Sequence, residues 1–568
     1  MNGSIRMRSG AILRWLILAL LWFGPLNTPH LFEPDEGRYA EIPREMVVSG
    51  DWVTPRLDGI KYFEKPALQY WATAAAFTLF GQHAWTARLW SALSAYLGLL
   101  LSFALARRLY DERTARLAVI VQASSLLYIG LSRITTLDMS LCFSLQLAMY
   151  ALTLLAQQRA TVQPAKVQGA ASTQESAPSS TSPARWQLPL LLGIGIALAV
   201  LSKGLVGILI PAAVAGIYFL WRRDWSLPLR ARPWWSLLAL LVLAAPWFLV
   251  VSLRNPEFAQ FFFVVQHFQR YLSTAGFDRY EPAWFFIPVL VLGILPWTSL
   301  LPGALQRAWL ALRGGENGTA LLVVWTVFVF VFFSLSHSKL IPYILPLLPA
   351  ICVLLARHLA NLPPARFARH MSALALCAGV LAAGLLVLWQ VPAAAPLVAR
   401  ASTGSIVGFA AAFLLLAAAA ALAAGLASRN RPTAAAVAAG LGGWMLAQCL
   451  LLGAEQLPRM RDLVSLEQDV KPWIGNSTRL YCVNDYLQPL PFYWRRTCTL
   501  VGYRGEMDFG LKQEPARWIP DLAQFERDWR SQDDALALLR PQDYRDLAAV
   551  GLPMRVIYTS QSLVAVKR

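Results

Sequence analysis

The chain has little charge and few of the residues that soluble enzymes use for metal or nucleotide chemistry. Only 14% of its 568 residues are charged, whereas 57% are hydrophobic and the mean hydropathy is +0.48. It has 6 cysteines and 6 histidines, and it shows no spacing typical of a zinc ribbon, a helix-turn-helix, a Walker or Rossmann loop, an HExxH helix or a Ser-His-Asp triad. These absences exclude a soluble globular protein and argue against nucleic acid as a partner.

Long apolar runs fill most of the chain instead. They are about 18 residues or longer, enough to cross the roughly 30 Å hydrocarbon core of a bilayer as a helix. The pattern predicts a polytopic α-helical membrane protein with about 13 transmembrane helices. The expected spans are residues 11–27, 85–106, 116–132, 138–157, 187–202, 204–221, 234–253, 284–302, 319–336, 340–356, 371–391, 404–427 and 433–453. The stretch 67–80 is only about 14 residues long, so we expect an interfacial or re-entrant helix there.

Basic residues orient the predicted helices. The formal net charge is +18, and much of the excess lies in short loops, as expected for loops on the cytoplasmic side. The clusters are Arg107 with Arg108, Arg222 with Arg223, Arg307 with Arg313, Arg357 with Arg366, and Arg429 with Arg431. This orientation makes the N-terminus cytoplasmic and puts loops 28–84 and 254–283 on the opposite side. The first apolar run could also be a cleaved signal, but no small-x-small site follows it, so we expect an uncleaved helix.

Two segments differ from the rest. Residues 158–186 are Ala, Gln, Ser, Thr and Pro with almost no charge, which predicts a flexible cytoplasmic linker. After a membrane domain of residues 1–453, residues 454–568 alternate strand-like and helix-like stretches and predict a small α/β domain outside the cytoplasm. Its expected strands are 478–483, 499–503 and 555–559, and its expected helices lie around 521–538 and 541–550. Cys482 and Cys498 either form a disulfide there or remain half-buried free thiols.

The densest charge cluster directly follows the first span. Its members are Glu33, Asp35, Glu36, Arg38, Glu41, Arg44 and Glu45. A loop that only reverses the chain uses Gly, Pro and Asn, so both charge signs together predict a site for a charged substrate beside the membrane. The alternative is a solvated loop that caps the helices through salt bridges. Asp138, at the start of the fourth span, is a second candidate, as a helix cap, a functional carboxylate or both.

Basic and tyrosine side chains are predicted on the same side of the membrane. They are Arg56, Tyr62, Lys65, Lys203, His267, Arg270, His337, Lys339 and Tyr343. Cations that converge on one face form a natural phosphate receptor, and the alternative is a surface of snorkelling side chains. Glu64 and His83 could share a divalent metal ion, Zn²⁺ or Mg²⁺, if the chain folds back near Gly81. A histidine satisfied at the interface is the favoured alternative.

Several motifs resemble a known family. Glu33-Pro34-Asp35-Glu36-Gly37-Arg38-Tyr39, Gly50-Asp51-Trp52 and Tyr62-Phe63-Glu64-Lys65-Pro66 resemble the GT-C glycosyltransferases related to protein O-mannosyltransferases. The likeness extends to Asp138, to Leu201-Ser202-Lys203-Gly204 and to Ser338-Lys339-Leu340 with Tyr343. Within this class, the layout is most similar to the bacterial 4-amino-4-deoxy-L-arabinose transferases that modify lipid A.

The resemblance implies a reaction and roles for the candidate residues. The donor would be undecaprenyl phosphate aminoarabinose, and the acceptor a phosphate of lipid A at the periplasmic face of the inner membrane. The transfer lowers the negative charge of lipid A and implies resistance to polymyxin and other cationic peptides. Asp35 and Asp138 match the family's key carboxylates, and Lys65 and Arg270 match its donor-phosphate ligands. We expect Arg56, Lys203, Lys339, Tyr62 and Tyr343 to assist at the phosphate, and Glu36 and Arg38 to contact the acceptor or organise the loop.

Two other functions remain open at this point. A protein O-glycosyltransferase with a polyprenyl-phosphate sugar donor would use the same site, but would need Asp35 as a general base. A lipid transporter would carry ionisable groups near the midplane of repeated halves, and neither feature is evident here. We expect a monomer in membrane lipid, with no obligatory cofactor and with the divalent metal ion as an open option.

Overall fold

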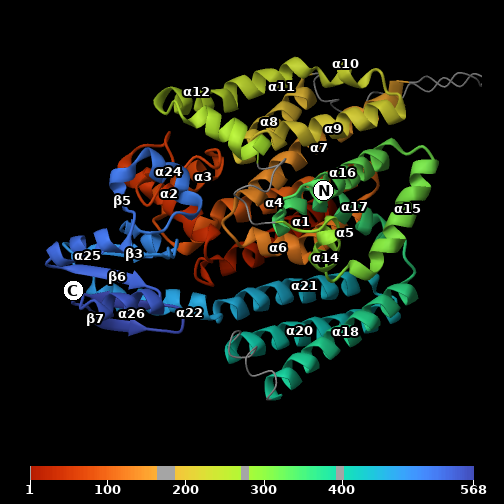
Figure 1. Cartoon of the computed structure of the whole chain (residues 1–568). Helices are drawn as coiled ribbons and strands as arrows, with labels where there is room; N and C mark the ends of the chain where they lie inside the picture. Colours follow the sequence, from red (N-terminus) through yellow and green to blue (C-terminus); the bar gives the residue numbers. More distant parts are fainter. Residues whose placement is uncertain (1, 163–185, 270–279, 392–401) are drawn as a thin grey trace, which may run out of the picture.

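The computed structural model describes residues 2–162, 186–269, 280–391 and 402–568, and helices dominate it (Figure 1). The predicted linker 158–186 therefore lies largely outside the described residues. The helices before the C-terminal domain are α1 (Asn2–Phe23), α2 (Asp35–Ser49), α3 (Leu68–Phe80), α4 (Ala84–Leu109), α5 (Glu112–Ser124), α6 (Leu126–Ser132), α7 (Leu137–Val162), α8 (Gln187–Lys203), α9 (Val206–Arg222), α10 (Leu227–Ala231), α11 (Pro233–Ala239), α12 (Ala245–Arg254), α14 (Phe286–Gly293), α15 (Leu301–Arg313), α16 (Asn317–Leu335), α17 (Leu348–Ala360), α18 (Pro364–Gln390), α20 (Thr403–Ser428) and α21 (Pro432–Glu455).

Each of the predicted spans coincides with an apolar helix or a bent helix pair. Among the described residues, 8 helices are long and apolar enough to cross a membrane, or up to 10 if each bent pair is one span. The pair α5 and α6 bends by 65°, and the pair Ala283–Gly293 and Thr298–Arg313 bends by 112°. Three shorter apolar helices, Ile12–Asn27, Gln187–Lys203 and Val206–Arg222, occupy the remaining predicted spans. Helix α3 has 13 residues, as expected for a segment too short to span.

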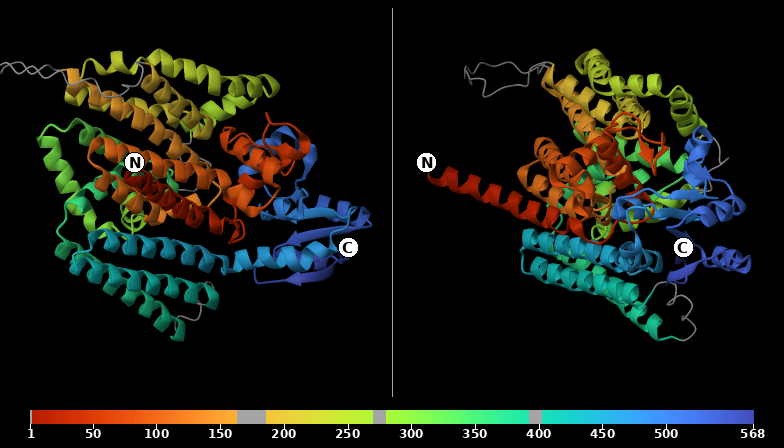
Figure 2. Two further views of the ribbon diagram at one scale, coloured as in Figure 1. Left: turned by 180° about the vertical axis from the view of Figure 1, so that it is seen from behind. Right: turned by 90° about the vertical axis from the view of Figure 1, so that its left-hand side faces the viewer.

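Burial separates the central helices from the peripheral ones. The measure is the buried share of the most apolar 18-residue stretch in each helix. It is 78% in α7 and in the segment Ile341–Ala360, but 17% in α18 and 22% in Leu227–Arg254. Helices α18, α20 and α21 form a layer along one side, and α8 to α12 lie on the opposite side (Figures 1 and 2). The peripheral helices expose large apolar side chains such as Leu253 and Leu376, which is the surface that lipid covers.

The acidic motif after the first span begins a helix, not the loop that the sequence led us to expect. Asp35 and Glu36 occupy the first turn of α2, where carboxylates interact favourably with the helix dipole. The helix ends at Gly50, whose φ of 72° suits a left-handed cap. Strands β1 (Arg56–Leu57) and β2 (Ile60–Lys61) then form a hairpin, and α3 packs against α2. The motif is therefore held rigidly at one end of the bundle.

The C-terminal domain is built on a six-stranded mixed sheet. The strand order is β5-β4-β3-β6-β8-β7; β3 to β6 are parallel to one another, and β8 runs antiparallel to β6 and β7. Its strands are β3 (Arg479–Val483), β4 (Thr499–Val501), β5 (Trp518–Ile519), β6 (Ala535–Leu539), β7 (Arg555–Thr559) and β8 (Val564–Lys567). Its helices are α22 (Pro458–Ser465), α23 (Leu490–Trp494), α24 (Asp508–Gln513), α25 (Leu522–Ser531) and α26 (Pro541–Ala549). The predicted α/β domain is confirmed.

One detail of that prediction needs correction, and the alternative left open for the two cysteines is decided. The helix expected around 521–538 ends at Ser531, and its last part is the strand β6. All five residues of β6 are buried because it lies between β3 and β8 with both faces covered, and such a strand lacks the polar alternation that marks a half-exposed one. Cys482 and Cys498 are both buried free thiols, so no disulfide links β3 to the residue before β4.

The domain shares a hydrophobic core with the segment after the first span. Leu480, Leu536 and Leu538 on one face of the sheet belong to the same cluster as Ile42 of α2 and Leu57 of the hairpin. The opposite face packs on α25 and α26 through Phe525, Trp529 and Leu547 (Figure 1). Contact with α2 is close, since a Cβ at Gly37 would lie 2.3 Å from the backbone nitrogen of Pro489.

Replacing Gly37 with alanine is therefore expected to separate α2 from the C-terminal domain. The added methyl group would meet backbone, which cannot rotate away, and overpacking of this kind costs about 1–3 kcal/mol. The matched control is Gly216→Ala on α9, where nothing lies within 4 Å of the new Cβ. Thermal unfolding of the purified variants tests this, and equal melting temperatures for both would show that the contact is not tight.

His30 forms an ionic link between the membrane helices and the C-terminal segment. Its Nδ1 lies 2.7 Å from Glu455 at the end of α21, and its Nε2 lies 3.5 Å from Glu467. Hydrogen bonds to these two carboxylates raise the pKa of His30 from its usual 6.5 to about 9, against the opposing effect of burial. The folded protein therefore holds a proton on His30 over a pH range in which the unfolded chain has lost it.

The pH dependence of stability follows from this proton. A raised folded-state pKa contributes stability that is fully present below pH 6.5 and is lost as pH rises towards about 9. We expect the melting temperature of wild type to fall over this range, and that of His30→Gln to fall less. Thermal unfolding at pH 6 and pH 9.5 measures the difference, and identical pH dependence in the two proteins would rule out the link.

Candidate functional site

A polar cavity of about 470 Å³ lies where α2, α7, α8 and the C-terminal domain meet. Its lining combines acids, bases and aromatic rings from segments that are far apart in the sequence. The residues are Asp35, Arg38, Tyr39, Glu64, Lys65, Thr136, Leu137, Asp138, Lys203, Phe261, Val265, Gln266, Leu340, Pro342, Tyr343, Gly505, Glu506, Asp508 and Phe509. Six of the predicted site residues are among them: Asp35, Arg38, Lys65, Asp138, Lys203 and Tyr343. Glu64, predicted as a metal ligand, lines it as well.

Asp35 is the accessible carboxylate of this cavity. Its side chain is 55% exposed and lies 3.5 Å from Nη1 of Arg38, one turn further along α2. The position at the start of the helix fixes the backbone, while the exposed side chain keeps freedom to meet a ligand. Asp35 can therefore contact a substrate directly.

Asp138 and Lys203 form a close ion pair in the same lining. Nζ of Lys203 donates to Oδ1 of Asp138 at 2.5 Å, and the same ammonium lies 4.6 Å from the ring centroid of Tyr343. Asp138 lies in the first turn of α7, and Lys203 is the last residue of α8. Because the carboxylate of Asp138 contacts this lysine, its role is more than that of a helix cap. The pair brings together three of the residues that the sequence singled out.

Lys65 lies beside Glu64 in the lining. Its Nζ donates to the carbonyl oxygen of Glu64 at 3.1 Å and lies 3.8 Å from Oε2 of the same residue. Both side chains are mostly buried, at 15% and 13% exposure, yet both reach the cavity. A lysine held in this way supplies positive charge without the full screening of bulk water.

The C-terminal domain supplies part of the wall, which the sequence did not reveal. Glu506 forms an ion pair with Arg38, and Nε of Arg38 donates to Oε1 of Gln488 at 2.9 Å. Burial opposes ionisation of Glu506, but the Arg38 guanidinium and the hydrogen bonds from the backbone, Gln488 and Tyr503 together outweigh it and lower the pKa of Glu506. The guanidinium also lies 5.8 and 5.7 Å from the ring centroids of Tyr39 and Tyr62. Arg38 therefore joins α2 to the domain at the cavity edge.

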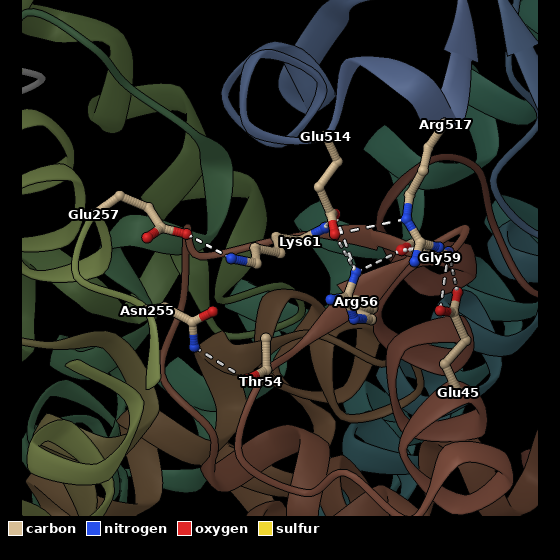
Figure 3. Close-up of polar contacts among 9 residues, drawn as sticks. All are labelled: Glu45, Thr54, Arg56, Gly59, Lys61, Asn255, Glu257, Glu514 and Arg517. Atoms are coloured by element: carbon tan, nitrogen blue, oxygen red, sulfur yellow. Dashed lines mark hydrogen bonds and ion pairs between the residues drawn. The ribbon is translucent and has the colours of Figure 1, made fainter. Parts of the chain in front are cut away.

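Three predicted phosphate ligands lie away from the cavity. Arg56 donates to the carbonyl of Gly59 at 2.7 Å and to Glu514 at 3.0 Å, so it fixes the hairpin to the C-terminal domain (Figure 3). Lys339 is buried and donates to two carbonyls, those of Glu281 and Ser336. Tyr62 is 2% exposed, and burial raises the pKa of its phenol. Arg56 and Lys339 therefore contact protein groups, whereas the hydroxyl of Tyr62 is buried without a hydrogen-bond partner among the described residues.

Figure 3 also shows how the hairpin joins its neighbours. Lys61 bonds Glu257 at 2.8 Å, and its backbone N–H donates to Glu514 at 3.0 Å. Two further bonds run from Asn255 to Thr54 at 3.0 Å and from the N–H of Gly59 to Glu45 at 2.9 Å. The charged residues of this hairpin serve the architecture around the cavity.

Glu36 is a buried carboxylate that connects the segments around the site. It is fully buried and accepts hydrogen bonds from Arg88 of α4 at 2.7 Å and from the N–H of Thr135 at 2.8 Å. One carboxylate thus ties α2, α4 and the turn before Asp138 together. Of the two roles expected for Glu36, the geometry fits the loop-organising one.

The remaining predicted residues are Arg270, His267, His337, Glu64 and His83. His337 is exposed and absent from the cavity lining, and the side chain of His267 lies outside the described part of the structure. Arg270 lies outside the described residues. Glu64 lines the main cavity, whereas His83 lines a different pocket beside His30 and Gln82 and stacks on Trp85. Within the described ranges, no group of three or more His, Cys, Asp or Glu side chains could hold a metal ion. A metal shared by Glu64 and His83 stays a prediction.

Comparisons with known proteins agree with this architecture. The family model for the aminoarabinose transferase C-terminal domain matches residues 466–568, and the model for dolichyl-phosphate-mannose-protein mannosyltransferase matches residues 9–262. An undecaprenyl phosphate-α-4-amino-4-deoxy-L-arabinose arabinosyl transferase of Pseudomonas aeruginosa is 32% identical over 92% of this chain and 91% of its own length. The one of Erwinia tasmaniensis is 36% identical, but that match covers 61% of this chain and 59% of the relative.

A solved structure extends the comparison to three dimensions. The crystal structure of ArnT from Cupriavidus metallidurans bound to undecaprenyl phosphate matches with a TM-score of 0.85 at 33% identity, over 98% of each chain. The helical bundle, the cavity at its end and the domain beside that cavity are the architecture of the GT-C class of membrane glycosyltransferases. Within this class, the chain belongs to the undecaprenyl phosphate-aminoarabinose arabinosyl transferase family, as its sequence motifs predicted.

Proposed function

We propose that this protein transfers 4-amino-4-deoxy-L-arabinose from undecaprenyl phosphate to a phosphate of lipid A. The observation that carries the proposal is the cavity in which Asp35, Lys65 and the Asp138–Lys203 pair meet at one end of an apolar bundle. Such a site suits a donor whose lipid tail stays in the membrane while its charged head reacts at the surface. The Cupriavidus relative was crystallised with undecaprenyl phosphate, which supports a donor of this type.

The cavity lysines have a clear role in this reaction. The leaving group is a lipid phosphate, and it gains negative charge as the bond to the sugar breaks. Lys65 and Lys203 are held in place before the reaction, so they stabilise that charge without reorganisation. Asp138 keeps the ammonium of Lys203 oriented into the cavity and is a positioning residue in this account.

Asp35 needs no proton transfer in this mechanism. A phosphate monoester has a second pKa near 6 and is already nucleophilic at neutral pH. Asp35 is therefore free to pair with the ammonium of the aminoarabinose and to stabilise positive charge at the reacting carbon. Its exposure beside Arg38 supports direct contact with the sugar.

The proposed orientation places the cavity and the C-terminal domain in the periplasm of a bacterial inner membrane. It is supported by Arg107 and Arg108 at the end of α4 and by Arg222 at the end of α9, since each helix starts near the cavity end and carries its cations at the other. A lipid A acceptor in the outer leaflet would then approach from the side of the domain.

A purified reaction tests the proposal. The protein in lipid nanodiscs is supplied with undecaprenyl phosphate aminoarabinose and with two acceptors, lipid A and a mixture of periplasmic proteins. Mass spectrometry is expected to show one added aminopentose on lipid A and none on protein. Transfer to protein alone would instead support the O-glycosyltransferase alternative.

A further inference from the structure

A second hollow, on the C-terminal domain, is lined by four arginines. It has a volume of about 710 Å³ and is separate in its lining from the main cavity. The amino-terminal ends of β3, β4 and β5 form its floor, and α25 forms one wall. Its arginines are Arg479, Arg496, Arg517 and Arg527, and we call it the arginine groove. The proposed transfer chemistry assigns it no role.

The groove has an excess of positive charge. Its acidic lining residues are Asp58 and Asp528. Asp58 is buried, and burial raises its pKa well above the usual range, which reduces its negative charge. Asp528 accepts a hydrogen bond from the hydroxyl of Tyr481 at 2.6 Å and lies 3.5 Å from Arg479. Within the lining itself, four guanidinium groups therefore face Asp528 and the buried Asp58, and a further carboxylate, Glu514, lies beside Arg517 just outside it.

Only carbonyl groups hold Arg496, and Arg517 shares its one carboxylate partner, Glu514, with Arg56, so the charge of both arginines is at most partly compensated. Arg496 donates to the carbonyls of Gly475 and Thr478 at 2.6 and 2.7 Å. Arg517 donates to the carbonyl of Gly59 at 3.2 Å and lies 3.6 Å from Glu514. Arg527 is exposed and makes no hydrogen bond or ion pair with any described residue. Guanidinium forks placed in this way match the paired oxygens of carboxylates and phosphates.

The rest of the lining suits a sugar better than an apolar peptide. Thr497, Thr499, Gln524 and Ser531 offer hydroxyl and amide groups, and Trp518 offers one aromatic face. Polar groups of this kind hydrogen-bond to the hydroxyls of a saccharide. The groove therefore combines anion recognition with polyol recognition.

The groove and the main cavity share one stretch of chain. Glu506, Asp508 and Phe509 line the cavity, and Ala516 to Ile519 line the groove. Helix α24 and strand β5 lie near each other on the domain (Figure 1). Ala516 follows Phe509 by seven positions, which limits the distance between the two residues to at most roughly 25 Å. An extended molecule that reacts in the cavity can therefore reach the groove.

We propose that the arginine groove binds an anionic oligosaccharide attached to the acceptor lipid. The carboxylates or phosphates of these sugars would contact the arginines while the lipid's own phosphate occupies the main cavity. This inference rests on the proposed function for the identity of the acceptor. It predicts that the protein prefers an acceptor that carries acidic sugars over the bare lipid.

The test compares two acceptors and two double variants of the full chain in nanodiscs. The acceptors are lipid A alone and lipid A extended by two carboxylate-bearing sugars. The groove variant is Arg479→Gln with Arg527→Gln. The control is Arg530→Gln with Arg545→Gln, which removes the same charge from exposed positions outside the groove lining. Binding of the released, fluorescently labelled acidic disaccharide is measured separately, without turnover.

We expect the groove variant to raise KM for the extended acceptor roughly tenfold, with kcat and the bare-lipid KM unchanged. It should also weaken disaccharide binding, and the control should do neither. Equal effects on both acceptors, or unchanged disaccharide binding, would overturn the proposal. If wild type transfers sugar to neither acceptor, the proposed function fails, and the disaccharide measurement alone then decides whether the groove binds acidic sugars.

Discussion

Replacing Lys65 with methionine is expected to lower kcat for aminoarabinose transfer by about 10²- to 10³-fold, the usual cost of removing one group that stabilises a developing anion. Methionine retains the apolar stem and removes only the ammonium. Lys65→Arg should recover part of the loss, because it restores the charge but not the compact geometry of an ammonium. Single-turnover kinetics with saturating donor separate this step from binding.

The matched control for this experiment is Lys471→Met. Lys471 lies 3.6 Å from Glu467 on the C-terminal segment and lines another pocket. Its replacement should leave kcat within about twofold of wild type, as expected for a surface salt bridge. If Lys65→Met also stays within that range, Lys65 does not stabilise the leaving phosphate.

Asp35→Asn is expected to impair transfer of the amino sugar roughly tenfold more than transfer of a neutral pentose. Asparagine keeps the size of the side chain but loses the charge that pairs with the sugar ammonium. Parallel assays with the amino and the hydroxy form of the donor measure the difference. The neutral donor is expected to lose activity as well, because the charge near the reacting carbon is also gone.

Asp51→Asn provides the reference for this comparison. Asp51 follows α2, lies 3.4 Å from Arg254 and is absent from the cavity lining, so its loss should affect both donors little. Equal losses for the two donors with Asp35→Asn would show that Asp35 does not recognise the ammonium. A general role in orienting the acceptor would then remain for this carboxylate.

Much of this site could be predicted because charge beside a membrane is costly. Asp138 and Lys203 stand out in an apolar sequence, and the structure pairs them at 2.5 Å. Asp35 and Lys65 lie in dense charged motifs on the same predicted side of the membrane. That shared side was enough to predict that they belong to one site. The membrane spans could be predicted as well, because the thickness of the bilayer sets the length of each apolar helix.

The remainder depends on contacts between distant segments. Arg56 and Arg38 are both arginines in the first outer segment, yet only Arg38 reaches the cavity. Their partners, Glu514 and Glu506, follow them by 458 and 468 positions, and no local pattern indicates such pairing. Glu506 and Asp508, which the C-terminal domain contributes to the cavity lining, were not predicted for the same reason. Strand β6 was misassigned because a strand buried on both faces carries no alternation.

The most direct measurement is the mass of lipid A from a bacterial strain that lacks its own aminoarabinose transferase but makes the donor. Expression of this protein should add one aminopentose to lipid A, and Asp35→Ala, expressed at the same level, should add none. An unmodified lipid A in cells that contain the folded wild-type protein and the donor would contradict the account.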